Sequence, residues 1–179
     1  MRRSDRAASG ARAFRTLRPC TADYATVPIQ CGFTWSESAA RLPAGEWYMV
    51  VFRSIRREPG ENLTLEMYDY GAYIEAQRRA SGLLFYFRGT PNERRECVSF
   101  CIWSNRDEAA RAARLPLHSL AMNSVDEMYE WYALERYVIR KRPGQERLEI
   151  EPAIAEERER LGSAMQLQAT DFQARQGAY

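Results

Sequence analysis

The stretch from Trp47 to Arg140 alternates between strand-like and helix-like segments, and this order constrains the fold more than any other feature of the sequence. Strand-like segments lie at 47–55, 83–87, 97–103 and 131–139. Helix-like segments lie at 63–79 and 106–128. Asn105 and Glu108 can form a capping box at the beginning of the second segment, and Pro116, which interrupts it, can be the first residue of a continuing helix. Because amphipathic helices must bury their apolar stripes against a sheet, the order strand, helix, strand, strand, helix, strand predicts an α+β domain.

Two of the strands differ in how they distribute apolar residues. Segment 47–55 is almost continuously apolar, which is typical of a strand buried on both faces, so we predict that it is central in its sheet. Segment 97–103 alternates: Val98, Phe100 and Ile102 form a face expected to meet the helices. Cys97, Ser99, Cys101 and Trp103 form a smaller, mildly polar face. That face indicates either the lining of a ligand cavity or a surface covered by another subunit.

Charge and cysteine usage exclude several classes of protein. The 26 basic residues are interspersed with 24 acidic ones, so no nucleic-acid-binding face is expected. No apolar run approaches the roughly 20 residues that span a bilayer, so no membrane partner is expected either. The four cysteines lack CxxC spacing, which favours reduced thiols and a cytoplasmic location.

The two ends of the chain differ from its centre. Residues 1–19 are rich in arginine and have Asp5 as their only acid, so we expect a flexible tail; a mitochondrial transit peptide is the alternative. Residues 20–142 are predicted to form the domain, entered through an extended arm that packs on it and a helical turn at 36–42. Residues 143–179 are predicted to be a C-terminal tail with an exposed helix at 152–162.

The order across 47–140 resembles the ferredoxin-like fold. Residues 99–118, SFCIWSNRDEAARAARLPLH, further resemble the dimeric α/β-barrel superfamily: a strand ending in Trp, a helix begun by acidic residues, and a broken helix that carries His118. That superfamily includes antibiotic-biosynthesis monooxygenases, haem-degrading monooxygenases and polyketide cyclases. The segments GEWY (45–48), FRS (52–54), MYE (128–130) and LERY (134–137) resemble an uncharacterised fungal and bacterial branch, some of whose members are linked to pyrone formation.

The resemblance implies a homodimer whose two sheets pack face to face, with a cavity for a hydrophobic or conjugated small molecule between sheet and helices in each protomer. Dimerisation is also a physical expectation, because the apolar face of a lone four-stranded sheet would be a large exposed patch.

Candidate site residues follow from their chemistry. His118, the only histidine, is the candidate acid or base, with a helix-surface histidine as the alternative. Glu135 is a candidate to orient His118 or hold a substrate proton, and Arg53 to donate hydrogen bonds; an Arg53–Glu135 or Arg136–Glu135 ion pair is the alternative. The residues expected to line a substrate pocket, unless they only pack the core, are Tyr48, Tyr86, Ser99, Trp103 and Tyr132.

Three functions remain open from the sequence. The leading one is an enzyme without cofactor or metal that cyclises a polyketide-like acyl compound to a lactone or pyrone, or hydrolyses it. The second is a haem-binding or oxygen-using protein in which His118 ligates iron. The third is a non-catalytic ligand-binding dimer, favoured by the absence of GxSxG, HExxH and glycine-rich phosphate motifs.

Overall fold

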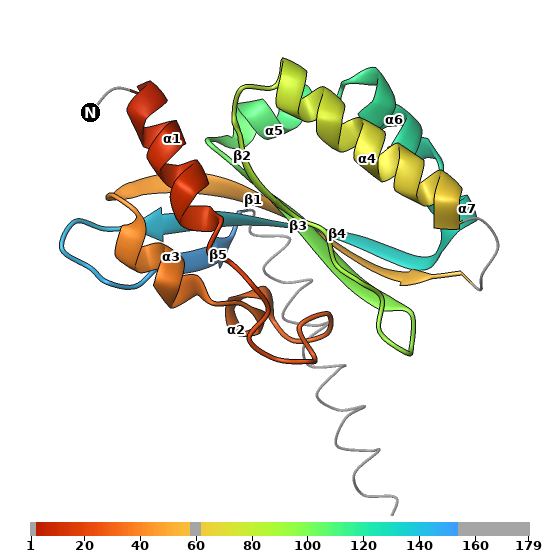
Figure 1. Cartoon of the computed structure of the whole chain (residues 1–179), viewed down its shortest axis with the longest axis horizontal. Helices are drawn as coiled ribbons and strands as arrows, with labels where there is room; N and C mark the ends of the chain where they lie inside the picture. The colour runs from red at the N-terminus through yellow and green to blue at the C-terminus, as the bar shows by residue number, and fades with distance from the viewer. Residues whose placement is uncertain (1–2, 58–61, 154–179) are drawn as a thin grey trace, which may run out of the picture.

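A computed structural model, which describes residues 3–57 and 62–153, contains one five-stranded antiparallel sheet with helices on both faces (Figure 1). The strands are β1 (Gly45–Arg56), β2 (Leu83–Phe87), β3 (Glu96–Trp103), β4 (Tyr129–Lys141) and β5 (Glu149–Pro152). The helices are α1 (Arg3–Phe14), α2 (Ile29–Gly32), α3 (Trp35–Arg41), α4 (Asn62–Arg79), α5 (Arg106–Ala112), α6 (Pro116–Asn123) and α7 (Val125–Met128).

The sheet order is β2-β3-β1-β4-β5, so β1 lies between β3 and β4 as its apolar sequence predicts. The first four strands with α4 and α5–α7 have the antiparallel order of a ferredoxin-like fold, and the predicted α+β class is confirmed. The sheet is open, with β2 and β5 at its edges, so the chain alone is not a closed barrel. Strand β5 was not predicted; the remainder of the predicted helix at 152–162 lies outside the described residues.

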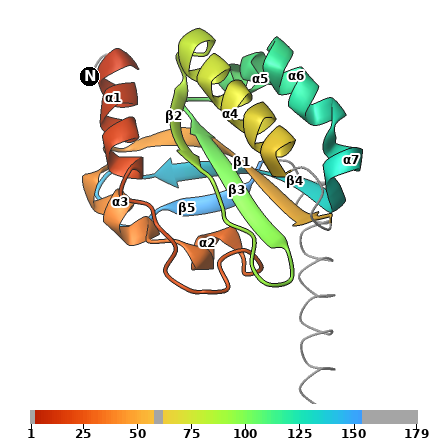
Figure 2. The ribbon, with the colours of Figure 1, turned by 45° about the vertical axis from the view of Figure 1, so that its right-hand side comes forward.

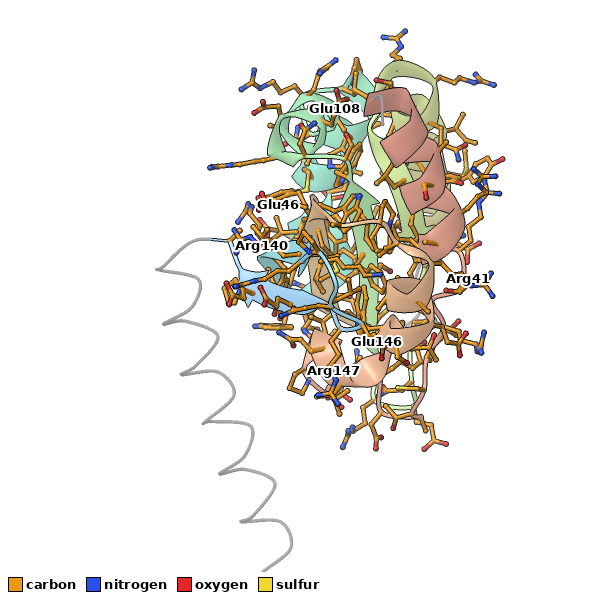
Figure 3. All side chains as sticks on the ribbon, turned by 90° about the vertical axis from the view of Figure 1, so that its left-hand side faces the viewer. Arg41, Glu46, Glu108, Arg140, Glu146 and Arg147 are labelled. Atoms are coloured by element: carbon orange, nitrogen blue, oxygen red, sulfur yellow. The ribbon has the colours of Figure 1, made fainter. Side chains whose placement is uncertain are left out.

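The register between β1 and β4 places Glu46 directly opposite Arg140. Figure 3 shows these two side chains next to each other near the end of the sheet, where Arg140 Nε lies 2.7 Å from Glu46 Oε2. Both side chains are largely exposed, so this pair marks the register and contributes little to stability.

Helices α1–α3 and their connections, residues 3–42, cover one face of the sheet and are called the N-terminal arm below (Figure 1). The buried apolar side chains that they supply are Phe14, Leu17, Ile29, Phe33, Trp35 and Leu42. Those that the sheet supplies include Met49, Val51, Val98, Phe100, Ile102 and Ile139. The rings of Phe33 and Phe100 meet edge to face at 4.9 Å. Val98, Phe100 and Ile102 therefore contact the N-terminal arm, and not helices α4–α7 as the sequence analysis expected.

The amino-terminal residues differ from the expected flexible tail. Residues 3–14 form α1, and its last residue, Phe14, is fully buried with its ring 5.5 Å from that of Trp47. The arm as a whole is packed on the sheet, as expected. The apolar face that a lone sheet would expose is thus covered from within the same chain, which removes the physical argument for dimerisation through that face.

Helices α4–α7 lie over the opposite face, with α4 and α6 side by side (Figure 2). The local signals that separate α5 from α6 act as predicted. Asn105 caps α5, its side-chain oxygen accepting a hydrogen bond from Glu108 N at 3.0 Å, and Pro116 is the first residue of α6. Among the described residues, no helix is both long and apolar enough to cross a bilayer.

Candidate functional site

A partly enclosed cavity of about 130 Å³ lies between the sheet and helices α4, α6 and α7. Side chains alternate across a strand, so Phe52 and Ser54 of β1 point to this face while their neighbours point to the arm. From β3 the cavity receives Cys97, Ser99, Cys101 and Trp103, the mildly polar face that the sequence singled out. Apolar cavities of roughly 150 Å³ hold a benzene-sized molecule, so this one accommodates about one ring.

Seven aromatic side chains line the cavity. They are Phe52, Tyr68, Tyr73, Tyr86, Trp103, Tyr129 and Tyr132. Two pairs stabilise each other: the ring centroids of Tyr73 and Tyr86 are 5.3 Å apart, and those of Tyr129 and Tyr132 are 5.4 Å apart. Flat walls with hydroxyl groups at their edges suit a conjugated ligand that carries oxygen atoms.

A polar group formed by Asp69, Tyr86 and Arg88 lies at the cavity wall. The Tyr86 hydroxyl donates a short hydrogen bond to Asp69 Oδ1, and Arg88 Nε lies 3.2 Å from Asp69 Oδ2. Burial, reinforced by the charge of Asp69, raises the pKa of Tyr86 well above its usual value. The hydroxyl therefore stays protonated, and the Asp69 carboxylate is satisfied on both oxygens.

His118 lines the cavity from α6. Burial lowers the pKa of its imidazole below the ordinary value of 6.5, although the carboxylates of Glu75 and Asp69 oppose this shift. The ring is therefore neutral at pH 7 and able to accept a proton. In the described part of the chain, no protein group forms a hydrogen bond with either ring nitrogen.

The cavity thiols are poor nucleophiles. Burial raises the pKa of Cys101 to about 12, and Trp103 Nε1 donates to its sulfur at 2.9 Å. Burial also raises the pKa of Cys97. Because the thiolate is the reactive form, neither cysteine is suited to covalent catalysis at neutral pH. The chemistry that this cavity supports is thus proton transfer by an imidazole among tyrosine and serine hydroxyls.

The structure brings five of the eight predicted site residues into this cavity: Tyr86, Ser99, Trp103, His118 and Tyr132. Tyr48 is buried on the same sheet face, opposite Trp103 in the register, but does not line the cavity. Arg53 and Glu135 lie on the other face, so the prediction that they act with His118 is not supported by their positions.

Arg53 and Glu135 instead hold the N-terminal arm on the sheet. Arg53 Nε lies 2.7 Å from Glu135 Oε1, and its two terminal nitrogens donate to Ala25 O at 2.6 Å and Val27 O at 2.9 Å. The Tyr137 hydroxyl donates to Glu135 Oε2 at 2.9 Å. This is the ion pair that the sequence analysis gave as the alternative, and it satisfies two charges that are largely buried.

Sequence reasoning missed seven polar cavity residues: Ser54, Arg56, Tyr68, Asp69, Tyr73, Arg88 and Tyr129. Arg56 lies one residue beyond the predicted strand 47–55, and the alternation that places Phe52 and Ser54 on the cavity face would have reached it. Tyr129 falls in the same alternating row as Glu135, and it lines the cavity where the register shifts between Ile55 and Arg56, which alternation does not predict. Asp69 and Arg88 come from a helix and a loop, where periodicity does not mark a cavity-facing position.

Neither a metal ion nor haem fits the side chains of the described residues. In residues 3–57 and 62–153, no group of three His, Cys, Asp or Glu side chains could hold a metal ion. Haem is a disc of four pyrrole rings, whereas the cavity beside His118 accommodates about one ring. The residues present do not fit that group.

Comparisons with known proteins identify a family. Residues 2–152 match the sequence model of the family described as PB2B2.08-like. No curated protein matches the chain. Similar solved structures include Rv0793 of Mycobacterium tuberculosis, with 18% identity, a TM-score of 0.44, and coverage of 50% of this chain and 91% of that one. SnoaB of Streptomyces nogalater, described as a cofactor-independent oxygenase, has 14% identity, a TM-score of 0.41, and coverage of 57% and 100%. At this level the likeness concerns the fold alone.

Proposed function

The chain belongs to the PB2B2.08-like family, and from the cavity described above we propose that it is a small-molecule enzyme that works without cofactor or metal. Its substrate is a polyketide-like, conjugated acyl compound, and its reaction is ring closure to a lactone or pyrone, or hydrolysis of the same acyl group. The observation that carries the proposal is a neutral imidazole, His118, lining an aromatic cavity of ring size.

His118 acts as the base. In a 3,5-dioxoacyl compound the imidazole removes a proton from C4, between the two ketone carbonyls, and the enolate oxygen on C5 then attacks the acyl carbon C1 to close a six-membered ring. A carbon–oxygen bond forms, the bond to the leaving group breaks, and the leaving group takes the proton from the imidazolium. In hydrolysis, a water deprotonated by His118 attacks the same carbon. General base catalysis of this kind contributes about 10²–10⁴-fold to the rate.

Hydroxyl groups on the sheet side supply hydrogen bonds to the enolate oxygen. Tyr132 and Tyr129 line the cavity opposite α4, and burial raises the pKa of both hydroxyls, to about 12 for Tyr129. Both therefore remain protonated donors at neutral pH. Donors fixed by the fold stabilise developing charge without the reorganisation that water requires.

The experiment uses the N-acetylcysteamine thioester of 3,5-dioxohexanoate. Release of the thiol and formation of the pyrone are followed in the wild-type protein, in His118→Gln, and in Leu120→Ala, an exposed position on the same helix. We expect His118→Gln to lose about 10²-fold or more in kcat, and Leu120→Ala to retain the wild-type rate. A His118→Gln protein with the wild-type rate refutes the role of the imidazole. Turnover that consumes oxygen favours the oxygen-using alternative.

The predicted homodimer and cytoplasmic location accompany this proposal. Because the arm covers the sheet face, a homodimer has to use another surface of the chain or displace the arm.

A further inference from the structure

Arg56, the last residue of β1, differs from Arg53, Arg57 and Arg88 in how its charge is balanced. It lines the cavity, and its Nε is buried with no hydrogen-bond partner in the described part of the chain. No carboxylate of the described residues forms an ion pair with it. A buried, unpaired donor costs free energy, so its retention needs an explanation.

Other arginines near Arg56 show the contrast. Arg88, also in the cavity wall, is paired with Asp69, and Arg53 on the opposite sheet face is paired with Glu135. Arg57, the next residue, is exposed and donates from Nε and Nη2 to the carbonyl oxygen of Asp126. Of these four, Arg56 alone lines the cavity without a carboxylate partner among the described residues.

The surroundings of Arg56 make the cavity polar at one end. Arg56 lies opposite Tyr129 in the sheet register, and Ser54, two residues earlier on β1, lies opposite Cys97. Burial raises the pKa of both Cys97 and Tyr129, and the positive charge of Arg56 partly offsets these rises, so the guanidinium acts on this end of the cavity. Trp103 and Leu83, which face each other across β2 and β3, line the apolar end.

We infer that the ligand carries a carboxylate and that Arg56 binds it, with the conjugated part of the ligand extending between the aromatic walls. An arginine N–H that meets a carboxylate gains a charge-assisted hydrogen bond, and the fork of the guanidinium matches the two carboxylate oxygens. The inference deepens the proposed function and rests on it for the location of the substrate. It names the class of substrate, a conjugated acyl compound that carries a carboxylate apart from the reacting acyl group, and a specificity residue.

The test compares cinnamate with cinnamamide, two probes of the same shape that differ in charge. Binding at pH 7 is measured by isothermal titration calorimetry to the wild-type protein, Arg56→Met and the control Arg57→Met. We expect the wild type to prefer cinnamate by about 10- to 100-fold, the range for a hydrogen bond to a charged group. Arg56→Met should lose this preference while its affinity for cinnamamide is unchanged, and Arg57→Met should match the wild type.

A second measurement reports on folding. Because Arg56 Nε lacks a partner, Arg56→Met without ligand should melt at the wild-type temperature or above it, and cinnamate should raise the melting temperature of the wild type only. Three results would overturn the inference: the wild type does not bind cinnamate, it binds both probes with equal affinity, or Arg56→Met keeps the preference for cinnamate. This binding test does not depend on turnover. If the protein prefers cinnamate through Arg56 but releases no thiol from the thioester substrate, the inference is supported and the proposed reaction is refuted.

Discussion

Replacing Arg53 by methionine should detach the N-terminal arm and cost much of the stability of the fold. The side chains of Arg53 and Glu135 are 10% and 8% exposed, and in the variant the Glu135 carboxylate keeps only the hydrogen bond from Tyr137. Removing one partner of a buried ion pair costs about 3–5 kcal/mol, because the remaining charge stays buried and unpaired. The carbonyl groups of Ala25 and Val27 lose their donors as well.

The assay is urea unfolding at pH 7, followed by tryptophan fluorescence, since Trp35 and Trp47 are both buried in the core that the arm completes. For a chain of this size, 1 kcal/mol corresponds to roughly 2–4 °C in melting temperature, so we expect Tm to fall by roughly 6–20 °C. Arg140→Met is the matched control: it removes the solvent-accessible ion pairs with Glu46 and Glu151 and should cost about 0–1 kcal/mol.

A double variant separates the buried charge from the shape of the site. Arg53→Met combined with Glu135→Leu removes both charges, and replacing both members of a buried pair with apolar groups is often nearly neutral. The double variant should therefore be more stable than Arg53→Met alone. A single variant that loses less than about 1 kcal/mol, or a double variant as unstable as the single one, refutes the reasoning.

Two further predictions concern His118 and Gly89. Burial lowers the pKa of His118 in the folded protein below its ordinary value of 6.5. As the pH falls below 6.5, the unfolded chain therefore binds more protons at this residue than the folded protein does, and the free energy of unfolding should decrease until the pH is below the lowered pKa. Urea unfolding from pH 5 to 7.5 should show this decline to be smaller in His118→Gln; the same decline in both proteins contradicts it. Gly89→Ala should destabilise by about 1–3 kcal/mol in a thermal melt, because an added Cβ would lie 2.0 Å from Val98 O. The control Gly71→Ala, whose Cβ meets only Leu117 at 3.4 Å, should be neutral or stabilising; equal effects of the two substitutions contradict the argument.

Several elements could be predicted because their signals are local. The continuous apolar run placed β1 in the centre of the sheet, and the Asn105 cap and Pro116 set the beginnings of α5 and α6. Alternation separated the two faces of β3, and for the mildly polar one it left two interpretations open, a cavity lining and a surface covered by another subunit; the structure shows that this face lines the cavity. Each signal depends on neighbours within a few residues, and so the sequence carries it directly.

The sequence could not tell which layer covers each face. Residues 1–19 show mostly arginine, alanine and serine, and the few apolar side chains that anchor them, such as Phe14 and Leu17, do not by themselves mark a packed helix. The same limitation placed Arg53 and Glu135 in the expected active site. The sequence predicted which residues share a face of each strand with Arg53 and Glu135, but it did not show whether that face lines the cavity or contacts the N-terminal arm.

By itself, the sequence determined the order of strands and helices, the central strand, and which side chains of β3 share a face, because backbone periodicity fixes the last of these. Only the tertiary structure decided that the N-terminal arm buries the opposite face, that Arg53 and Glu135 hold it there, and that His118 and Arg56 meet at one cavity. These depend on contacts between residues far apart in the chain, whose free energy comes from apolar surface and charges buried together, and no local pattern records such partners.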